Sequence, residues 1–381
     1  MAPDLRSKLL PLLCGSLLFA PLCAQEAVKD VLSLRDGRKL RGVEITAATS
    51  TSVQYKHRNT TAEVAASLVA EIEWDHPPDE MAQARGAQKS GDATMASNYF
   101  LTAAGKTTRA PLKSECEFLA AQALQMGSVK DKAASAEAAR KLEEWVNANA
   151  DGFRLPDALL ALGRAQVAAE QYPEAEASFK KLADETLSRS WSPIWSARAK
   201  IGQAQAQVAR RDFANARSTY RSTLSALQSL SEQERKSDEV VGIQAEAMVG
   251  TGDSLVREGK FDDALSYFRD EIGRTAESDA IRAAAKAGEG EAIFLKAQAS
   301  GAPTADLRRA QIAFAEANLL DTVGGDTTAK ALYYTAMVLL ALGPDRDGSA
   351  VRQRANEYLQ AVIDDHAGSR WAALAASEIK K

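Results

Sequence analysis

The side chains that most often carry metal or nucleophilic chemistry are few in this chain and far apart. The histidines are His57, His76 and His366, and neither they nor the cysteines have the spacing of a zinc site. The sequence contains neither the Gly-x-Ser-x-Gly turn of serine hydrolases nor the acidic loop that binds calcium. It therefore predicts a protein that is not an enzyme, with no catalytic residues, no metal site and no cofactor.

Two short motifs resemble parts of binding sites. Residues 105–107 (Gly-Lys-Thr) match the end of a phosphate-binding loop, but Phe100 stands where that loop needs its first glycine. Residues 364–366 (Asp-Asp-His) offer three metal-ligating side chains, but consecutive residues of a helix point in different directions. We interpret the first motif as a polar turn between helices and the second as the end of a helix.

Residues 1–24 have the pattern of a secretory signal peptide. Arg6 and Lys8 precede an apolar run at 9–21, and the small residue Ala24 closes the segment. This run is shorter than the roughly 20 residues that span a bilayer, so we expect cleavage after Ala24 rather than a membrane anchor. No later run is long enough to span a membrane, which predicts an exported, soluble product, periplasmic or extracellular in a bacterium.

The composition is that of a folded, helix-rich protein. Of the 381 residues, 45% are hydrophobic and 26% are charged, which is ordinary for a globular chain. Only 6% are aromatic and alanine is common, which favours closely packed helices. The formal net charge of −4, with both signs interspersed, argues against nucleic acid as a partner. Cys116 would be the one cysteine left after cleavage, and its helical context predicts a buried side chain rather than a reactive thiol.

Residues 28–77 predict a small module of β-strands. Alternating segments at 31–34 and 39–45 flank an Asp-Gly turn, which is a strong hairpin signal. Three further strand candidates follow, at 51–56, 63–65 and 70–74. So many short strands indicate a small closed β-barrel, and their order is similar to that of the SH3-like or Sm-like barrels that precede helical repeats in some bacterial envelope proteins. We interpret the basic residues of the hairpin as a solvated face rather than a nucleic-acid site.

Beyond residue 78 the sequence predicts helical hairpins, and residues 252–268 are the clearest example. Residues 259–260 mark a tight turn between two helices, and the small residues Gly252 and Ala264 let these helices approach closely. The side chains expected to fill the space between them are Leu255, Phe261 and Phe268. This order of small and aromatic residues resembles the tetratricopeptide repeat (TPR). One such hairpin cannot bury its own apolar face, so neighbours should stack on it.

Matching hairpins recur along the chain. Residues 172–179 and 213–220 match 261–268, and Gly163 and Ala204 stand nine residues before them, where the reference hairpin has its own small residue. Weaker matches continue the series in both directions. The resemblance therefore predicts a mostly α fold, in which a TPR-like α-solenoid follows the β module.

The predicted solenoid occupies residues 79–381. It contains about seven helical hairpins and ends in a C-terminal capping helix that begins near Ser369. The alanines that mark the second helix of successive hairpins, from Ala175 to Ala355, are 41 to 48 residues apart. The standard repeat has about 34 residues, so longer helices or longer connections are expected.

In the repeat proteins that this chain resembles, ligands lie in the concave groove lined by the first helix of each hairpin. The resemblance assigns the following residues to that face: Asp157, Arg164, Arg198, Gln205, Glu246, Asp253, Arg257, Tyr333 and Met337. Their charges alternate in sign, so a clamp of several lysines and asparagines around one carboxylate is not expected. The alternative interpretation is that these side chains form a solvated inner surface.

Aromatic residues form a second candidate surface. These residues are Trp191, Trp195, Trp371, Tyr333 and Tyr334. They either belong to the core, as aromatic side chains at helical spacing usually do, or form a recognition surface. Trp191 and Trp195 are the most interesting pair because they flank an expected helix start.

The predicted function is a non-enzymatic protein–protein interaction scaffold of the bacterial cell envelope. Its partner would be a protein or peptide held in the concave groove, without nucleic acid and without a membrane span after signal cleavage. Two alternatives remain open at this point. One is a structural envelope component that forms a homo-oligomer through the barrel or the edge of the repeats, and the other is an enzyme whose site has no recognised motif.

Overall fold

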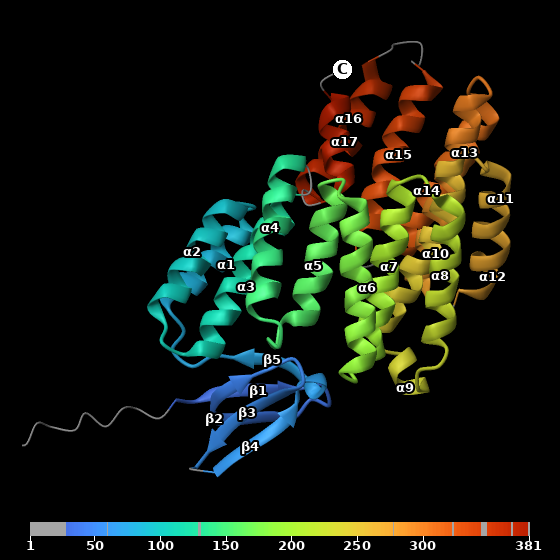
Figure 1. Ribbon diagram of the computed structural model, residues 1–381. Helices are drawn as coiled ribbons and strands as arrows, with labels where there is room; N and C mark the ends of the chain where they lie inside the picture. The colour runs from blue at the N-terminus through green and yellow to red at the C-terminus, as the bar shows by residue number, and fades with distance from the viewer. Residues whose placement is uncertain are drawn as a thin grey trace, which may run out of the picture.

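The computed structural model places a small β-sheet before an array of helices (Figure 1). The residues that it describes are 28–58, 60–128, 131–276, 278–321, 324–343, 349–366 and 369–379. The predicted signal sequence at 1–24 lies outside these residues. The mostly α fold expected from the sequence is confirmed.

The sheet is antiparallel, with strand order β4-β3-β2-β1-β5. Its strands are β1 (Asp30–Leu34), β2 (Lys39–Ala48), β3 (Ser52–His57), β4 (Thr60–Ala65) and β5 (Val69–Glu73), and the 3₁₀ turn η1 (Ala66–Leu68) joins the last two. The first half of β2 pairs with β1 and its second half pairs with β3, so the sheet curves around the side chains between them. The five predicted strands are present, and the described ladders leave β4 and β5 as the edges of a curved sheet.

Seven helical hairpins follow, and α17 (Arg370–Ile379) packs on the last of them. Their first helices are α1 (Asp79–Lys89), α3 (Ala110–Gly127), α5 (Leu155–Ala168), α7 (Pro193–Ala209), α10 (Asp238–Glu258), α13 (Asp279–Ala299) and α15 (Asp326–Leu342). Their second helices are α2 (Ala93–Lys106), α4 (Lys132–Ala148), α6 (Tyr172–Ser188), α8 (Phe213–Leu227), α11 (Phe261–Ser266), α14 (Thr304–Leu320) and α16 (Ser349–Asp365). The predicted number of hairpins and the capping helix are both confirmed.

Extra length in the middle of the array explains the wide spacing of the marker alanines. Helices α10 and α13 each have 21 residues, and a short helix, α9 (Glu232–Arg235), precedes α10. After α11 the chain continues through a π-helical segment (Tyr267–Ile272) and α12 (Gly273–Thr275). Longer helices and added segments therefore account for the departure from the standard repeat.

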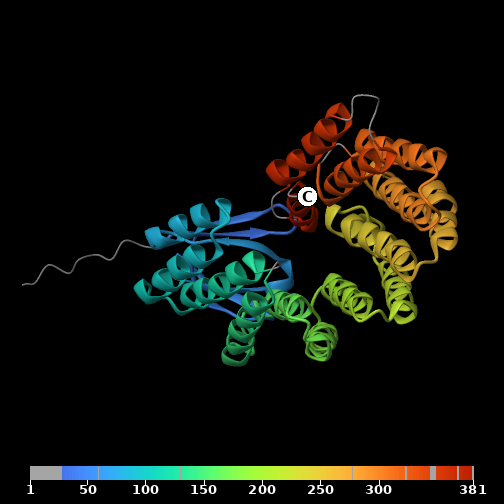
Figure 2. The same ribbon diagram turned by 90° about the horizontal axis from the view of Figure 1, so that it is seen from above.

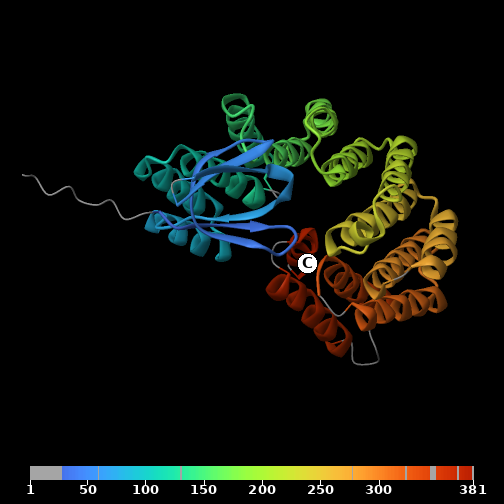
Figure 3. The ribbon, with the colours of Figure 1, turned by 90° about the horizontal axis from the view of Figure 1, so that it is seen from below.

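The first helices pack against one another along the array, so the hairpins stack in order. Seen from above, the colours pass along an arc from teal through green and yellow to red (Figure 2), and the view from below shows the same arc (Figure 3). The red helices α15 to α17 also lie higher than the green ones in Figure 1. The array is thus a rising superhelix with a concave inner side.

Two aromatic rings, Phe179 and Phe268, each fix the spacing of two neighbouring first helices. Phe179 of α6 lies where side chains on Gly163 of α5 and Gly202 of α7 would be. A methyl group at either glycine would overlap this ring, which is 1% exposed. Phe268 occupies the same kind of space between Gly252 and the next first helix, α13, as the small residues of this hairpin predicted. Glycine is required here because the ring and two backbones share one small volume.

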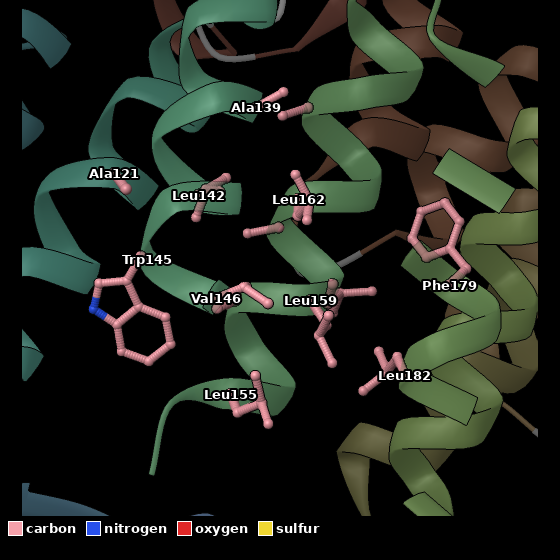
Figure 4. Close-up of a cluster of buried hydrophobic side chains, with 14 of the residues drawn as sticks. Ala121, Ala139, Leu142, Trp145, Val146, Leu155, Leu159, Leu162, Phe179 and Leu182 are labelled. Carbon is pink, nitrogen blue, oxygen red and sulfur yellow. The ribbon is translucent and has the colours of Figure 1, made fainter. Parts of the chain in front are cut away.

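The core around α5 shows how the hairpins interlock (Figure 4). Leu142 and Trp145 of α4 face one side of α5, where Leu159 is only 1% exposed. Phe179 and Leu182 of α6 pack from the other side. The apolar stripe of each helix is therefore covered by both of its neighbours in the chain, which is how a hairpin that cannot bury its own face becomes stable in an array.

The sheet is fixed to the helices by a buried carboxylate. Asp30 of β1 is fully buried and accepts hydrogen bonds from the backbone N–H groups of Ile45 (3.0 Å) and Asp75 (2.8 Å). The guanidinium of Arg109, just before α3, binds both oxygens of Asp30 and lies over the Trp74 ring. A buried carboxylate is stable only when its oxygens accept several hydrogen bonds, so the contact fixes the sheet in one orientation on α3.

We predict that the glycines under the aromatic rings cannot be enlarged. Gly252→Ala should lower the free energy of unfolding by about 1–3 kcal/mol, because the added methyl meets the Phe268 ring in a close-packed core. Gly242→Ala in the same helix meets no atom within 4 Å and should instead add about 0.5–1 kcal/mol through helix propensity. Urea denaturation followed by circular dichroism measures both, and equal stabilities of the two variants would contradict the prediction.

Candidate partner-binding groove

The concave side of the array carries polar stripes, because residues seven apart lie about two helical turns apart on one face. On α10 this face presents Glu239, Glu246 and Asp253, and it ends at Arg257. Four of the predicted residues continue it on neighbouring helices: Asp157 and Arg164 on α5, and Arg198 and Gln205 on α7. We call this surface of α5, α7 and α10, together with the starts of α15 and α17, the inner groove.

Contacts across the helices show that these stripes lie side by side. The Gln205 Nε2 atom donates to Glu246 Oε1 over 2.7 Å, and the Arg198 Nη2 and Glu239 Oε1 atoms are 2.8 Å apart. Arg164 lies close enough to Glu246 for that carboxylate to exert an upward effect on the pKa of its guanidinium. The structure thus brings the predicted residues of α5, α7 and α10 together on one surface.

A cavity lies toward the C-terminal ends of α7 and α10. It measures about 380 Å³ and is lined by residues of α7, α8 and α10 and by the first residues of α15 and α17. Gln205, Glu246, Asp253 and Arg257 are among its lining residues, and Arg370 closes it from α17. We call it the upper cavity. Helices far apart in the sequence therefore face one another across the inner groove.

Tyr220 reaches the upper cavity from a second helix, which the sequence did not predict. Its ring passes over Gly250 of α10, where any side chain would overlap it. Burial, together with the carboxylates of Glu246 and Asp253, raises the pKa of Tyr220. The Tyr220 hydroxyl therefore stays neutral and can donate a hydrogen bond into the groove at physiological pH.

Lys330, near the start of α15, is a buried charge that the sequence analysis also missed. Its Nζ atom lies 3.0 Å from Asp253 Oδ1 and 2.5 Å from Glu291 Oε2, and the Tyr334 hydroxyl donates to Glu291 over 2.8 Å. Burial disfavours the charged amine, but the two carboxylates outweigh it and raise the pKa of Lys330. This network joins α10, α13 and α15. The sequence around Lys330 does not indicate its partners, because Glu291 and Asp253 stand about 40 and 80 residues earlier in the chain.

Two of the predicted groove residues lie elsewhere. Tyr333 is only 8% exposed and packs against the Trp371 ring, with the ring centroids 5.6 Å apart. Met337 is packed against the same core. The capping helix α17 covers this side of α15, so the two side chains belong to the C-terminal core and not to the open groove surface. Trp371 and Tyr334 belong to the same cluster, as the core interpretation of these aromatic residues expected.

Two arginines on the α5 and α10 stripes of the inner groove have no partner among the residues that the structure describes. Arg164 and Arg257 are exposed, and neither takes part in an ion pair or a side-chain hydrogen bond there. Partial desolvation by the surrounding side chains lowers the pKa of Arg164, the Glu246 carboxylate opposes this shift, and Arg198 adds to it. Both arginines stay charged at any physiological pH, so they remain available to a bound molecule.

Within the described ranges, no group of three or more histidine, cysteine, aspartate or glutamate side chains is arranged to hold a metal ion. None of the described helices is at once long and apolar enough to pass through a bilayer. Cys116 is buried, and burial together with the nearby Glu115 raises the pKa of its thiol to about 12. The thiol therefore stays protonated, as expected for a packing residue.

Comparisons with known proteins do not identify a function for this chain. No protein family model matches the chain, and no curated protein matches it. Among solved structures it is similar to NprR in complex with its cognate peptide NprX, with 11% sequence identity, coverage of 78% of this chain and 82% of that chain, and a TM-score of 0.45. Nothing about this chain's function follows from a likeness of that size.

We predict that Lys330 acts as a unit with its two carboxylates. Lys330→Met leaves Asp253 and Glu291 without their cation and should lower the free energy of unfolding by about 3–5 kcal/mol. The triple variant K330M/D253N/E291Q removes all three charges and should recover most of that loss. Urea denaturation of both proteins measures the difference, and a single variant at least as stable as the triple one would disprove the coupling.

Proposed function

We propose that this chain is a non-enzymatic binding scaffold of the bacterial cell envelope, and that its inner groove holds an extended segment of a partner polypeptide. The observation that carries the proposal is that Arg164 and Arg257 have no ion-pair or side-chain hydrogen-bond partner among the described residues, whereas Arg198 and Lys330 nearby are paired. An arginine without an internal partner can form an ion pair with a bound molecule at low cost, since no contact within the protein has to be broken first.

The dimensions of the groove suit a peptide. From Glu239 to Arg257 the α10 stripe covers about 27 Å at 1.5 Å per residue. An extended chain advances about 3.3 Å per residue, so roughly eight residues of a partner could lie along it. Hydrogen-bond donors and acceptors both occur along this length, among them the Gln205–Glu246 pair and the Tyr220 hydroxyl. The backbone amides of a bound peptide could pair with them.

The rigidity of the scaffold supports the same proposal. The first helices are held apart by buried aromatic rings at glycines, and Lys330 ties three of them together. A groove that is already formed before binding loses little conformational entropy when a segment enters it. The helices therefore serve as a fixed template, and the side chains of the partner supply the selectivity.

We predict that reversing the two open charges abolishes capture. The double variant R164E/R257E should bind peptides selected against the wild-type protein from a random-sequence display library at least about tenfold more weakly, because each attractive contact becomes repulsive. Fluorescence anisotropy of the labelled selected peptides gives the dissociation constants.

A matched control exists on the outer helices. Arg221 of α8 and Arg308 of α14 are exposed and have no ion pair among the described residues. The double variant R221E/R308E changes the net charge by the same amount and should bind as the wild type does. Selection without any sequence convergence, or equal losses in the two double variants, would count against the groove as the binding site.

Export is part of the proposal and has its own test. We expect the protein recovered from the periplasm or medium of a bacterial host to begin at Gln25, because a short apolar run ending in a small residue is removed on secretion. Placing arginines at Leu13 and Leu17 should break that run and keep the full-length precursor inside the cell. Terminal sequencing of fractionated cells decides this, and an uncleaved wild-type chain in the cytoplasm would refute it.

A further inference from the structure

The upper cavity contains two guanidinium groups that are not paired with any anion of the described chain. Arg257 reaches the cavity from the last turn of α10, and Arg370 reaches it from the first residue of α17. Both side chains are exposed, and neither has an ion pair or a side-chain hydrogen bond among the residues that the structure describes. Two positive charges that face the same space repel each other, so an anion between them is attracted by both.

Arg370 is also held in a fixed orientation. Its guanidinium lies over the Trp371 ring, with the central carbon 4.2 Å from the ring centroid. The N–H groups of a stacked guanidinium point outward in its own plane, where an acceptor can meet them. Four other described arginines lie over aromatic rings, and each of them also binds a carboxylate: Arg109, Arg154, Arg189 and Arg198. Arg370 has the same stacking without the carboxylate.

Tyr220 gives a second, independent indication of a ligand at this place. Its side chain is only 4% exposed and lines the upper cavity, yet its hydroxyl has no hydrogen-bond partner among the described residues. This oxygen is not one of the described polar atoms that are fully enclosed without a partner. It lies over Gly250, which lines the same cavity. The hydroxyl is therefore open to the cavity and can donate to an acceptor that enters it.

The carboxylates of the cavity wall do not satisfy these donors. Asp253 contacts Lys330 at 3.0 Å. Glu246 accepts a hydrogen bond from Gln205 over 2.7 Å. Asp326 is exposed and lies in the first turn of α15, where the positive end of the helix stabilises a negative charge. None of these three described carboxylates forms an ion pair with either open guanidinium of the cavity.

The cavity also has an apolar part. Val208 and Ala209 of α7 and Val249 of α10 contribute to its wall. The volume of about 380 Å³ is larger than a single carboxylate needs, so the group that carries the carboxylate enters as well. The wall therefore suits a carboxylate that stands beside an aliphatic group.

We propose that the upper cavity binds a carboxylate of the partner segment, between Arg257 and Arg370 and within reach of the Tyr220 hydroxyl. This inference rests on the proposed function, because the carboxylate belongs to the polypeptide in the inner groove, and it fixes which part of that polypeptide lies at the end of α10. The carboxylate comes from a chain terminus or from an acidic side chain, since both present the same planar acceptor to a guanidinium.

Four small ligands test the cavity without a polypeptide. N-acetyl-leucine carries a terminal carboxylate beside an aliphatic side chain, and N-acetyl-leucine amide is its uncharged counterpart. N-acetylglutamic acid α-amide carries only the side-chain carboxylate, and N-acetylglutamine amide is its uncharged counterpart. In nuclear magnetic resonance titrations of the wild-type protein at constant ionic strength, the Arg370 Nε–H signal, assigned by its loss in R370Q, should move and saturate with at least one acid. The amides should leave it in place, and the acid that binds more tightly identifies the source of the carboxylate.

Three variants make the result specific, with dissociation constants read from saturation-transfer difference spectra of the ligands. Arg370→Gln should weaken binding of the acids on the order of tenfold, because a charged donor is lost. Arg164→Gln, in the same groove but outside the cavity lining, should leave it unchanged. Tyr220→Phe keeps the ring over Gly250 and should weaken binding several-fold without lowering the stability of the protein, because the hydroxyl has no partner among the described residues.

The outcomes separate this inference from the proposed function. The carboxylate site is overturned if neither acid moves the Arg370 signal more than its amide does, or if Tyr220→Phe binds both acids as the wild type does. It is also overturned if peptides selected against the protein keep their affinity after their termini are amidated and their acidic side chains are replaced by amides, a result that leaves the groove itself standing. Binding of the acids by a protein that selects no peptides would uphold the carboxylate site and count against the polypeptide.

Discussion

The close approach of neighbouring first helices is the constraint on which the rest of the structure depends. Phe179 and Phe268 each enter the space between two first helices, and glycine on both sides is what leaves room for the ring. Because interiors are packed to crystal-like density, the ring size and the missing side chains together fix the spacing between hairpins. Repeated along the chain, that spacing produces the arc seen in Figures 2 and 3.

The inner groove follows from this arc. With first helices on the concave side and parallel to one another, residues seven apart on α5, α7 and α10 meet across helices, as Gln205 and Glu246 do. The superhelix also brings α15 back toward α10, so that Lys330 reaches Asp253 and binds the array across a whole hairpin. The buried ionic contact and the open arginines are thus two results of one geometry: charges that meet are neutralised, and those facing the central space remain open.

The sheet has a structural role that its size does not suggest. Asp30 and Arg109 fix it to α3, and its first turn reaches α10 through Arg35 and Glu239. It therefore lies against α3 and the starts of α5, α7 and α10. A cavity of about 400 Å³ lies between the sheet and these helix starts, and the largely buried Trp191 is part of its wall.

The sequence by itself determined the kind of elements and their order. An Asp-Gly turn between alternating residues specifies a hairpin of strands, and small residues placed against Phe268 specify a hairpin of helices, because both are local patterns of turn chemistry and side-chain size. The resemblance to the repeat family also assigned Asp157, Arg164, Arg198 and Gln205 to one face, through the register of the small residues.

Only the tertiary structure decided which distant residues meet. Lys330 finds its carboxylates on two other helices, Tyr220 reaches the groove only because Gly250 lacks a side chain, and Tyr333 is buried only because α17 folds back over α15. Each of these outcomes depends on the pitch of the superhelix, which is set by the sum of many packing contacts. No single stretch of sequence encodes that sum, and so the inner faces of α5, α7 and α10 were predictable, while the partners of their residues and the inner face of α15 were not.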